Sequence, residues 1–166
     1  INLSASSVKD EGFVDFLKEQ LDNYRIFPES ICFEISENVV VSQLNAATKL
    51  MESLKSLGFS LALDDFGCGV SSLNYLKKIS IDYCKINGNL VKQIGDDALA
   101  YEMVKMINRI GHILGIKTIA KFVTDNSILT KVREMGVDYG QGYGIAPPRP
   151  LVINPHTLYE IIGMED

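Results

Sequence analysis

The stretch "LALDDFGCGV", residues 61–70, places two adjacent aspartates directly after a short apolar strand. Leucine and alanine lead into Asp64 and Asp65, and a glycine-rich turn follows. Neighbouring carboxylates repel each other, and burying them costs free energy unless a cation or hydrogen bonds compensate. No basic residue occurs in the ten positions after Asp65, so a bound metal ion is the predicted compensation.

Short apolar runs rich in β-branched residues recur on both sides of this stretch. They cover residues 1–5, 31–36, 60–65, 82–87, 117–122 and 139–145. Each run is continuous rather than alternating, which is typical of strands buried on both faces. Apolar stripes at helical spacing lie between the runs, within residues 13–21, 50–57 and 104–114. Gly58 and Gly115 follow two of these stripes, where glycine commonly ends a helix.

This alternation of strands and helices predicts an α/β fold with parallel strands and right-handed crossovers. Six such units suit an incomplete (β/α)₈ barrel and an open doubly wound sheet equally well, so periodicity leaves both open. No linker or low-complexity segment interrupts the pattern, and one domain over residues 1–166 is predicted.

Composition narrows the function classes. The net charge of −5 argues against binding a nucleic acid polymer, because such binding needs a basic surface. The three cysteines are odd in number and lack metal-binding spacing, which indicates reduced thiols in a cytoplasmic setting. No apolar run is long enough to span a membrane. The chain starts without methionine and is interpreted as an excerpt, so it also suits the cytoplasmic part of a membrane-anchored protein.

Polar side chains gather within or at the ends of the predicted strands. They are Asn2, Glu34, Asp64, Asp65, Lys85, Lys121 and Gln141. In parallel α/β folds the carboxyl ends of the strands carry the ligand site, so we expect these residues to line one cavity. Oxygen ligands without histidine or cysteine suit Mg²⁺, Mn²⁺ or Ca²⁺ rather than zinc. Paired carboxylates of this kind are typical of two-metal phosphoryl chemistry.

Five quoted stretches resemble the EAL domain family of cyclic di-GMP phosphodiesterases and their degenerate receptor relatives. They are "INLSA", "FEISE", "LALDDFGCGVSSLNYLKKISIDYCKIN", "GIKTIAKFV" and "GVDYGQGY", in the family's order and spacing from residue 1 to about 151. The resemblance implies a TIM-like barrel with one reversed strand, incomplete here at its N-terminus. Residues 1–166 would then form the C-terminal two-thirds of the barrel, without the first strands and the Glu-Ala-Leu signature.

The resemblance also assigns roles to individual residues. It implies metal ligands at Asn2, Glu34, Asp64 and Asp65, with Mg²⁺ or Mn²⁺ as the cofactor. It implies catalytic roles for Asp65 and Lys85, and a degenerate catalytic position at Lys121. Substrate contacts fall on Asp64, Asp65, Lys85 and Gln141. Glu37 matches the glutamate that anchors the loop after the aspartate pair, residues 66–72.

The sequence departs from the family pattern at "AKFVT", residues 120–124. Lys121 and Thr124 stand where the family carries two glutamates. Exchanging glutamate for lysine changes the local charge by two units, and an ammonium about 4 Å from a cation costs roughly 4 kcal/mol per unit charge at an effective dielectric of 20. We therefore expect the Lys121 ammonium to lie within salt-bridge range of Asp64 or Asp65 and to replace one metal ion. At most one weakly bound Mg²⁺ or Mn²⁺ ion would remain.

Three functions stay open. The chain is interpreted first as a degenerate EAL domain that binds cyclic di-GMP or regulates a partner, with weak or absent hydrolysis because of Lys121. The alternative is an active Mg²⁺- or Mn²⁺-dependent phosphodiesterase that produces pGpG, which the otherwise intact residue set favours. The third is a scaffold that acts as a homodimer through helices near the "DDFG" loop. Fusion to GGDEF or sensory modules is implied by the family.

Met103, Met106 and Met135 are interpreted as core-filling residues.

Overall fold

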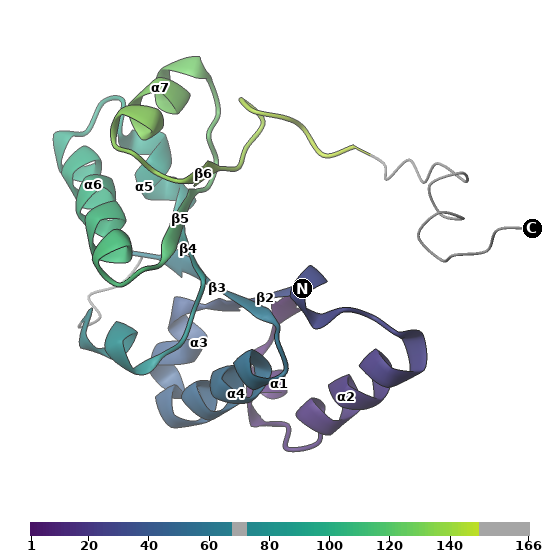
Figure 1. The fold of residues 1–166 in the computed structure, drawn as a ribbon. Coiled ribbons are helices and arrows are strands. Elements are labelled where there is room, and N and C mark those ends of the chain that lie inside the picture. The colour runs from purple at the N-terminus through teal and green to yellow at the C-terminus, as the bar shows by residue number, and fades with distance from the viewer. Residues whose placement is uncertain (68–72, 150–166) are drawn as a thin grey trace, which may run out of the picture.

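Six parallel strands form a single sheet in a computed structural model that describes residues 1–67 and 73–149 (Figure 1). The strands are β1 (Asn2–Leu3), β2 (Cys32–Ser36), β3 (Ser60–Phe66), β4 (Tyr83–Ile86), β5 (Lys117–Ala120) and β6 (Tyr139–Gly140). All six predicted strands are therefore confirmed. The first and the last, β1 and β6, are much shorter than predicted because a cap and a turn end them. Ser4 caps the first helix by accepting a hydrogen bond from Ser7 N, and Gly142 opens a turn closed by Ile145 N.

The order of the strands decides between the two predicted topologies. The strands lie side by side in chain order, from β1 to β6, and every neighbouring pair is parallel. Right-handed crossovers in an unreversed order place all helices on one face, whereas a doubly wound sheet reverses its order at a switch point. The sheet is therefore a section of a TIM-like barrel, and β1 and β6 are its two edges among the described residues.

Helices flank the sheet in two groups (Figure 1). The first group, beside β1 to β3, consists of α1 (Ala5–Lys9), α2 (Phe13–Tyr24), α3 (Glu37–Ser42) and α4 (Leu44–Ser56), with the 3₁₀ turn η1 (Pro28–Ser30). The second group consists of α5 (Gly88–Gln93), α6 (Ala98–Ile113) and α7 (Asn126–Glu134), and the 3₁₀ turn η2 (Leu73–Lys78) precedes β4. No helix within residues 1–67 and 73–149 is long and apolar enough to cross a membrane.

Caps fix where the helices begin and end. Ser36, Asp97 and Asp125 accept hydrogen bonds from the first backbone N–H groups of α3, α6 and α7. These donors have no partner inside the helix, so the caps stabilise the helix starts. Gly58 and Gly115 follow α4 and α6 with φ of 96° and 73°, a left-handed conformation that favours glycine. Their predicted role at the helix ends is confirmed.

The apolar core lies between the sheet and its helices, and the charged side chains of Glu34, Asp64 and Lys85 lie on the opposite face of the sheet. In β2, Phe33 and Ile35 are fully buried, and Phe33 makes edge-to-face contacts with the rings of Phe13 and Phe59. Glu34, between them, is only partly buried on the other face. The expectation that strands would be buried on both faces is therefore wrong for β2, which alternates. That alternation leaves a partly exposed face on which charged side chains can lie.

The methionine prediction is also partly wrong. Met135 packs against the core, but Met106 is 51% exposed on the outer side of α6. Val104 and Ile107 in the same helix are buried, and Met106 lies between them in sequence but about 200° around the helix from Val104.

Candidate functional site at the carboxyl ends of the strands

A β-bulge at the end of β3 lets the two aspartates face the same partner. Between Leu63 and Phe66, β3 has two residues where β4 has one. The second of these, Asp65, has φ of 55°, a left-handed conformation that aspartate tolerates better than most residues. A regular strand would direct Asp64 and Asp65 to opposite faces of the sheet. The bulge instead brings both carboxylates within reach of one ammonium group.

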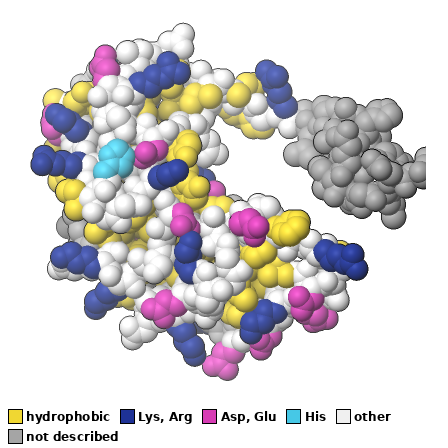
Figure 2. Space-filling view, in the orientation of Figure 1, with side chains coloured by type: hydrophobic (Ala, Val, Ile, Leu, Met, Phe, Trp, Pro, Cys, Tyr) yellow, Lys and Arg dark blue, Asp and Glu magenta, His cyan; other side chains and the backbone are white. Residues whose placement is uncertain are grey.

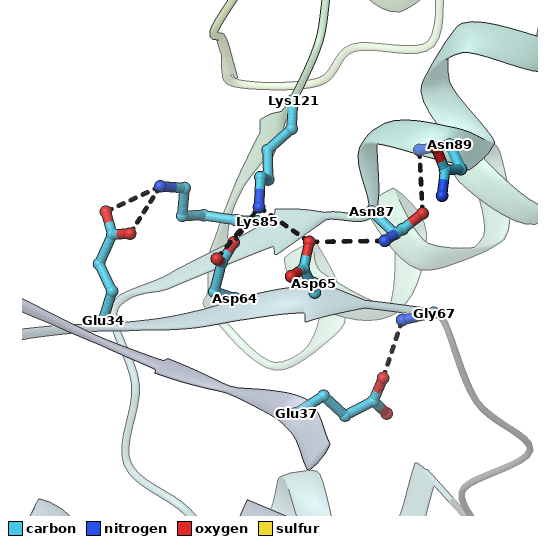
Figure 3. Close-up of polar contacts among 9 residues, drawn as sticks. All are labelled: Glu34, Glu37, Asp64, Asp65, Gly67, Lys85, Asn87, Asn89 and Lys121. Atoms are coloured by element: carbon cyan, nitrogen blue, oxygen red, sulfur yellow. Dashed lines mark hydrogen bonds and ion pairs between the residues drawn. The ribbon is translucent and has the colours of Figure 1, made fainter. Parts of the chain in front are cut away.

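That ammonium belongs to Lys121, which follows β5 (Figure 3). Its Nζ donates to Asp64 Oδ1 at 2.8 Å, to Asp64 Oδ2 at 3.0 Å and to Asp65 Oδ1 at 2.8 Å. The side chains of Lys121 and Asp64 are 16% and 17% exposed, and that of Asp65 is 44% exposed. Burial lowers the pKa of Lys121, but its hydrogen bonds to Asp64 and Asp65 outweigh burial and raise the pKa above 10.5. Lys121 is therefore a charged ammonium at neutral pH.

A second lysine neutralises the neighbouring glutamate. Lys85 Nζ on β4 donates to both carboxylate oxygens of Glu34 on β2, each at 2.8 Å. Lys85 is buried, and a buried ammonium is stable only with a well-placed counter-charge. We call Glu34, Asp64, Asp65, Lys85 and Lys121 the strand-end cluster. It holds three carboxylates and two ammonium groups: Lys85 pairs with Glu34, and Lys121 pairs with both aspartates.

Asn87 connects the strand-end cluster to helix α5. Its Nδ2 donates to Asp65 Oδ1 at 3.4 Å, and its Oδ1 accepts from Asn89 N at 2.9 Å as the cap of α5. The only sequence signal for this contact is the position of Asn87 directly after β4. Helix α5 and the cluster are therefore positioned together (Figure 3).

Glu37 is hydrogen-bonded to two segments near the cluster, the end of β3 and the turn η2 (Figure 3). Its Oε2 accepts from Gly67 N at 3.0 Å, and its Oε1 accepts from the Tyr75 hydroxyl at 2.8 Å. Glu37 is the first residue of α3, and it is buried. Glu37 was predicted to anchor the loop of residues 66–72. Its hydrogen bond from Gly67 N reaches the start of that loop, and residues 68–72, Cys68 among them, lie outside the described residues.

The two outer candidates lie at the edges of the cluster. Asn2 is exposed on β1, in register with Glu34 of β2. Gln141 follows β6, and its backbone N donates to Ala120 O at 2.8 Å. Gln141 and Lys121 line the same cavity. The strand order thus brings residues from positions 2 to 141 to one end of the sheet.

The cavity beside Lys121 has a volume of about 640 Å³, within the usual range for small-molecule sites. Its lining residues are Lys92, Lys121, Phe122, Thr124, Gln141, Gly142, Tyr143, Ala146, Pro147 and Pro148. Phe122 has φ of 54°, and Lys92 Nζ lies 4.5 Å from its ring centroid. A Cβ on Gly88 would overlap the Phe122 ring, so glycine there makes room for it.

Three of these lining residues were missed as site candidates from the sequence. Phe122 and Tyr143 lie inside quoted motifs, next to Lys121 and two residues after Gln141, so adjacency was the available signal. Lys92 on α5 carries no local signal, because only the fold brings it over the Phe122 ring.

The cluster does not fit a two-metal centre. Both oxygens of Glu34 and of Asp64, and one oxygen of Asp65, already accept hydrogen bonds from ammonium groups. The ammonium groups of Lys85 and Lys121 thus engage the carboxylate oxygens that a metal ion would need as ligands. Within residues 1–67 and 73–149, no group of three or more histidine, cysteine, aspartate and glutamate side chains is arranged to hold a metal ion.

The fold and site together define a class: a TIM-like barrel section with charged side chains at the carboxyl ends of its strands. The profile of the EAL domain matches residues 1–148, and the chain belongs to the EAL domain family. The resemblance in the quoted motifs is thereby confirmed.

Two similar proteins are named cyclic di-GMP phosphodiesterases. The chain is 38% identical over 151 residues to cyclic di-GMP phosphodiesterase PdeB of Shewanella oneidensis, covering 91% of this chain and 18% of that protein. It is 39% identical over 151 residues to cyclic di-GMP phosphodiesterase PdeA of Borreliella burgdorferi, covering 91% and 22%. The chain thus spans about a fifth of the length of these two relatives.

A solved structure supports the fold independently. The FimX EAL domain of Pseudomonas aeruginosa bound to cyclic di-GMP superposes with a TM-score of 0.84 at 31% identity. The match covers 89% of this chain and 60% of that one.

Proposed function

We propose that this chain is part of an EAL domain that binds cyclic di-GMP and hydrolyses it slowly or not at all. The observation that carries the proposal is the Lys121 ammonium, bonded to both Asp64 and Asp65. It holds these carboxylates together without a metal ion, so no metal-bound water is generated there to attack phosphorus. The family in general depends on divalent metals, and Lys121 opposes that chemistry locally.

The cavity next to Lys121 supports nucleotide binding. Phe122 and Tyr143 offer exposed aromatic faces, on which bases stack. Lys92 supplies positive charge to this cavity, and Lys121 neutralises part of the charge of Asp64 and Asp65, which would otherwise repel a phosphate. FimX and its bound cyclic di-GMP make that nucleotide the first ligand to test. We assign Lys85, Lys121 and Gln141 to the phosphate side and the aromatic residues to the bases.

A second candidate is an active phosphodiesterase, since PdeB and PdeA bear that activity in their names. The favouring observation is that Asn2, Glu34, Asp64 and Asp65 lie at the same end of adjoining strands. In this alternative Lys121 would move away from the aspartates when metal and substrate bind.

Calorimetry on the full-length domain, including its upstream strands, separates the candidates. We expect cyclic di-GMP to bind with the same affinity, within about twofold, in EDTA and in Mn²⁺, because protein cations hold the site. We expect turnover with Mn²⁺ well below about 1 per second, the low end for ordinary enzymes. Turnover at or above that rate would overturn the proposal, and failure to bind the nucleotide would favour the homodimeric scaffold.

Reverting the substituted positions tests the role of Lys121 directly. Lys121→Glu removes the ammonium and restores a carboxylate, so we expect Mn²⁺ affinity to rise at least tenfold. If the upstream signature glutamate is present, hydrolysis should appear as well. Thr124→Glu is the matched control, because it adds one carboxylate at the same cavity while leaving the ammonium in place. A Lys121→Glu protein that binds two Mn²⁺ ions and stays inactive would place the lesion elsewhere.

A further inference from the structure

Phe122 has a backbone conformation that bulky side chains rarely adopt. Its φ is 54°, in the left-handed region, where the Cβ of an L-residue crowds the backbone. Among the residues that the structure describes, the other non-glycine residues with positive φ are Arg25 and Asp65. Arg25 ends α2, where this conformation is ordinary, and Asp65 belongs to the strand-end cluster. Strained residues of this kind gather at ligand sites, so the conformation of Phe122 points to a role in binding.

The residues on both sides of Phe122 fix the direction of its side chain. Lys121 is held by its bonds to the two aspartates. Val123 is fully buried, and its backbone N donates to Gln141 O at 3.0 Å. Phe122 lies between them and is 51% exposed on the wall of the cavity of about 640 Å³. Figure 2 shows hydrophobic side chains along the segment after β6, which forms another wall of this cavity.

Helix α5 contacts the Phe122 ring on one face and one edge. Lys92 Nζ lies 4.5 Å from the ring centroid, within the range of a cation–π interaction. Gly88 lies one turn earlier, on the same side of α5, and a Cβ there would overlap the ring edge formed by Cγ, Cδ2 and Cε2. Because Phe122 is nevertheless half exposed, the ring face opposite Lys92 is accessible from the cavity.

Helix α5 is a fixed support for this ring. Val91, next to Lys92, is fully buried, and Asn87 caps the start of the helix. Asn87 Nδ2 also donates to Asp65 Oδ1 at 3.4 Å, which joins the same helix to the strand-end cluster (Figure 3). The ring is therefore held from two directions, through α5 and through Lys121, and both lead to the same aspartate.

We propose that Phe122 provides the stacking surface for one base of the bound nucleotide, and that Gly88 is the positioning residue that leaves room for its ring. This inference rests on the proposed function and adds which residue receives a base and which helix holds it. Tyr143, the other aromatic residue of the cavity, is 76% exposed, so the protein holds it less closely than Phe122. Stacking on an aromatic ring strengthens binding about tenfold or more per base.

A fluorescent reporter tests the stacking directly, because residues 1–166 contain no tryptophan. We expect cyclic di-GMP to quench the emission that Phe122→Trp adds to the full-length domain by about half or more, since a stacked base quenches indole. Phe16→Trp in α2 is the matched control: Phe16 is 53% exposed and lies outside the cavity lining, so its emission should not change. Calorimetry shows whether the nucleotide binds. Binding by Phe122→Trp without quenching overturns the stacking role and leaves the proposed function intact, whereas no binding by the unmodified domain contradicts both.

Gly88→Ala tests the positioning role. Its Cβ would displace the ring, so we expect the affinity for cyclic di-GMP to fall about tenfold. Alanine favours a helix more than glycine does, so weakening of α5 does not explain such a loss. Gly95→Ala, just after α5, is the matched control, because a Cβ there would meet only Ile128 Cδ1 at 3.8 Å. It should leave the affinity unchanged, and circular dichroism checks that both variants fold.

A double-mutant cycle separates positioning from general damage to the site. Phe122→Ala alone should weaken binding about tenfold, because it removes the ring. Adding Gly88→Ala to Phe122→Ala should then cost less than about twofold, since no ring is left to displace. An equal loss with and without the ring, or unchanged affinity in Gly88→Ala alone, overturns the positioning role. Unchanged affinity in Phe122→Ala overturns the stacking surface itself.

Discussion

The two ends of strand β5 each carry a polar cluster, and the clusters differ in kind. At the carboxyl end, Lys121 forms ion pairs with two aspartates beside a cavity. At the amino end, Asp138 Oδ2 accepts hydrogen bonds from the backbone N and from the hydroxyl of Thr118. The same oxygen lies 2.9 Å from His112 Nε2. Thr118 and Asn108 there are fully or almost fully buried.

The difference shows how to separate a site from a structural network. The amino-end cluster ties α6, β5 and the start of β6 together, and Asn108 adds a bond to Met135 O at 2.9 Å. Its groups are mostly neutral; Thr118 and Asn108 are buried, whereas His112 and Asp138 are exposed at the surface. The carboxyl-end cluster joins charge to charge beside a cavity of about 640 Å³, whereas Asn108 and His112 of the amino-end cluster border a more open hollow of about 470 Å³. We therefore expect mutations at the two ends to separate stability from ligand binding.

The largest expected effect is at the amino end. Thr118→Val keeps the shape of the side chain but removes its hydroxyl. That hydroxyl is hydrogen-bonded to Asn108 Oδ1, so the buried Asn108 loses a partner. We expect the free energy of unfolding to fall by about 2–3 kcal/mol, the penalty for buried polar groups left unsatisfied. Affinity for cyclic di-GMP should change less than twofold. Urea denaturation and calorimetry measure the two quantities, and a large loss of affinity at unchanged stability would contradict the distinction.

Lys121→Met should lower the affinity for cyclic di-GMP more than it lowers the free energy of unfolding. The change removes an ammonium from two aspartates, one of which is 44% exposed and screened by water, so we expect a stability loss of only about 1 kcal/mol. Cyclic di-GMP affinity should fall about tenfold, because Asp64 and Asp65 lose their counter-charge and repel the phosphates. The same two measurements apply. If stability falls by more than it does in Thr118→Val, the carboxyl-end cluster is structural as well.

The two ends should also lose stability at opposite extremes of pH. The pKa of Lys121 is raised, so its contribution is present below 10.5 and disappears as pH rises through the higher folded-state pKa. Burial raises the pKa of Asp138, but bonds from Thr118 and His112 outweigh it and lower the pKa. Its contribution is present above 3.8 and disappears as pH falls through the lower folded-state pKa.

Denaturation of the unmodified chain and of Lys121→Met across the alkaline range measures the first effect. The stability difference between the two proteins should narrow above pH 10.5 and stay constant near neutrality. A difference that persists unchanged at high pH would show that the lysine acts through packing alone.

The smallest effect concerns the backbone of the bulge. Asp65→Asn keeps a residue that tolerates positive φ and a polar group for Lys121, so we expect a stability change within about 0.5 kcal/mol. Asp65→Ala should cost about 1 kcal/mol more, because alanine is strained in the left-handed conformation. Equal stability of the two variants would mean that the positive φ of Asp65 is not under strain.

Much of the fold could be predicted from the sequence because continuous apolar runs and helix-ending glycines are local signals. All six strands and the roles of Gly58 and Gly115 follow from them. The choice between barrel and doubly wound sheet could not follow from periodicity, because strand order is a long-range property. The motifs resolved it, and the sequential order confirms the barrel.

At the site, the Lys121 contact to Asp64 and Asp65 was expected from one charge reversal in a known motif, and the structure places it at 2.8 Å. The bulge that makes both contacts possible was not predicted, since positive φ at aspartate leaves no mark in composition. Lys92 was missed for a related reason: its place over Phe122 depends on how α5 packs against the end of β5. The metal, catalytic and loop-anchoring roles stay predictions.

The parallel order of the strands has a kinetic consequence. Lys85 and Glu34 are 51 residues apart in sequence, and Lys121 and Asp64 are 57 apart, so neither pair can form from local structure. Each pair skips one strand of the sheet, and each pairing must wait for intervening helical crossovers to close large loops. We therefore expect the strand-end cluster to form late in refolding, after the secondary structure. Comparing far-ultraviolet circular dichroism with recovery of nucleotide binding in stopped flow would reveal the delay between chain collapse and a working pocket.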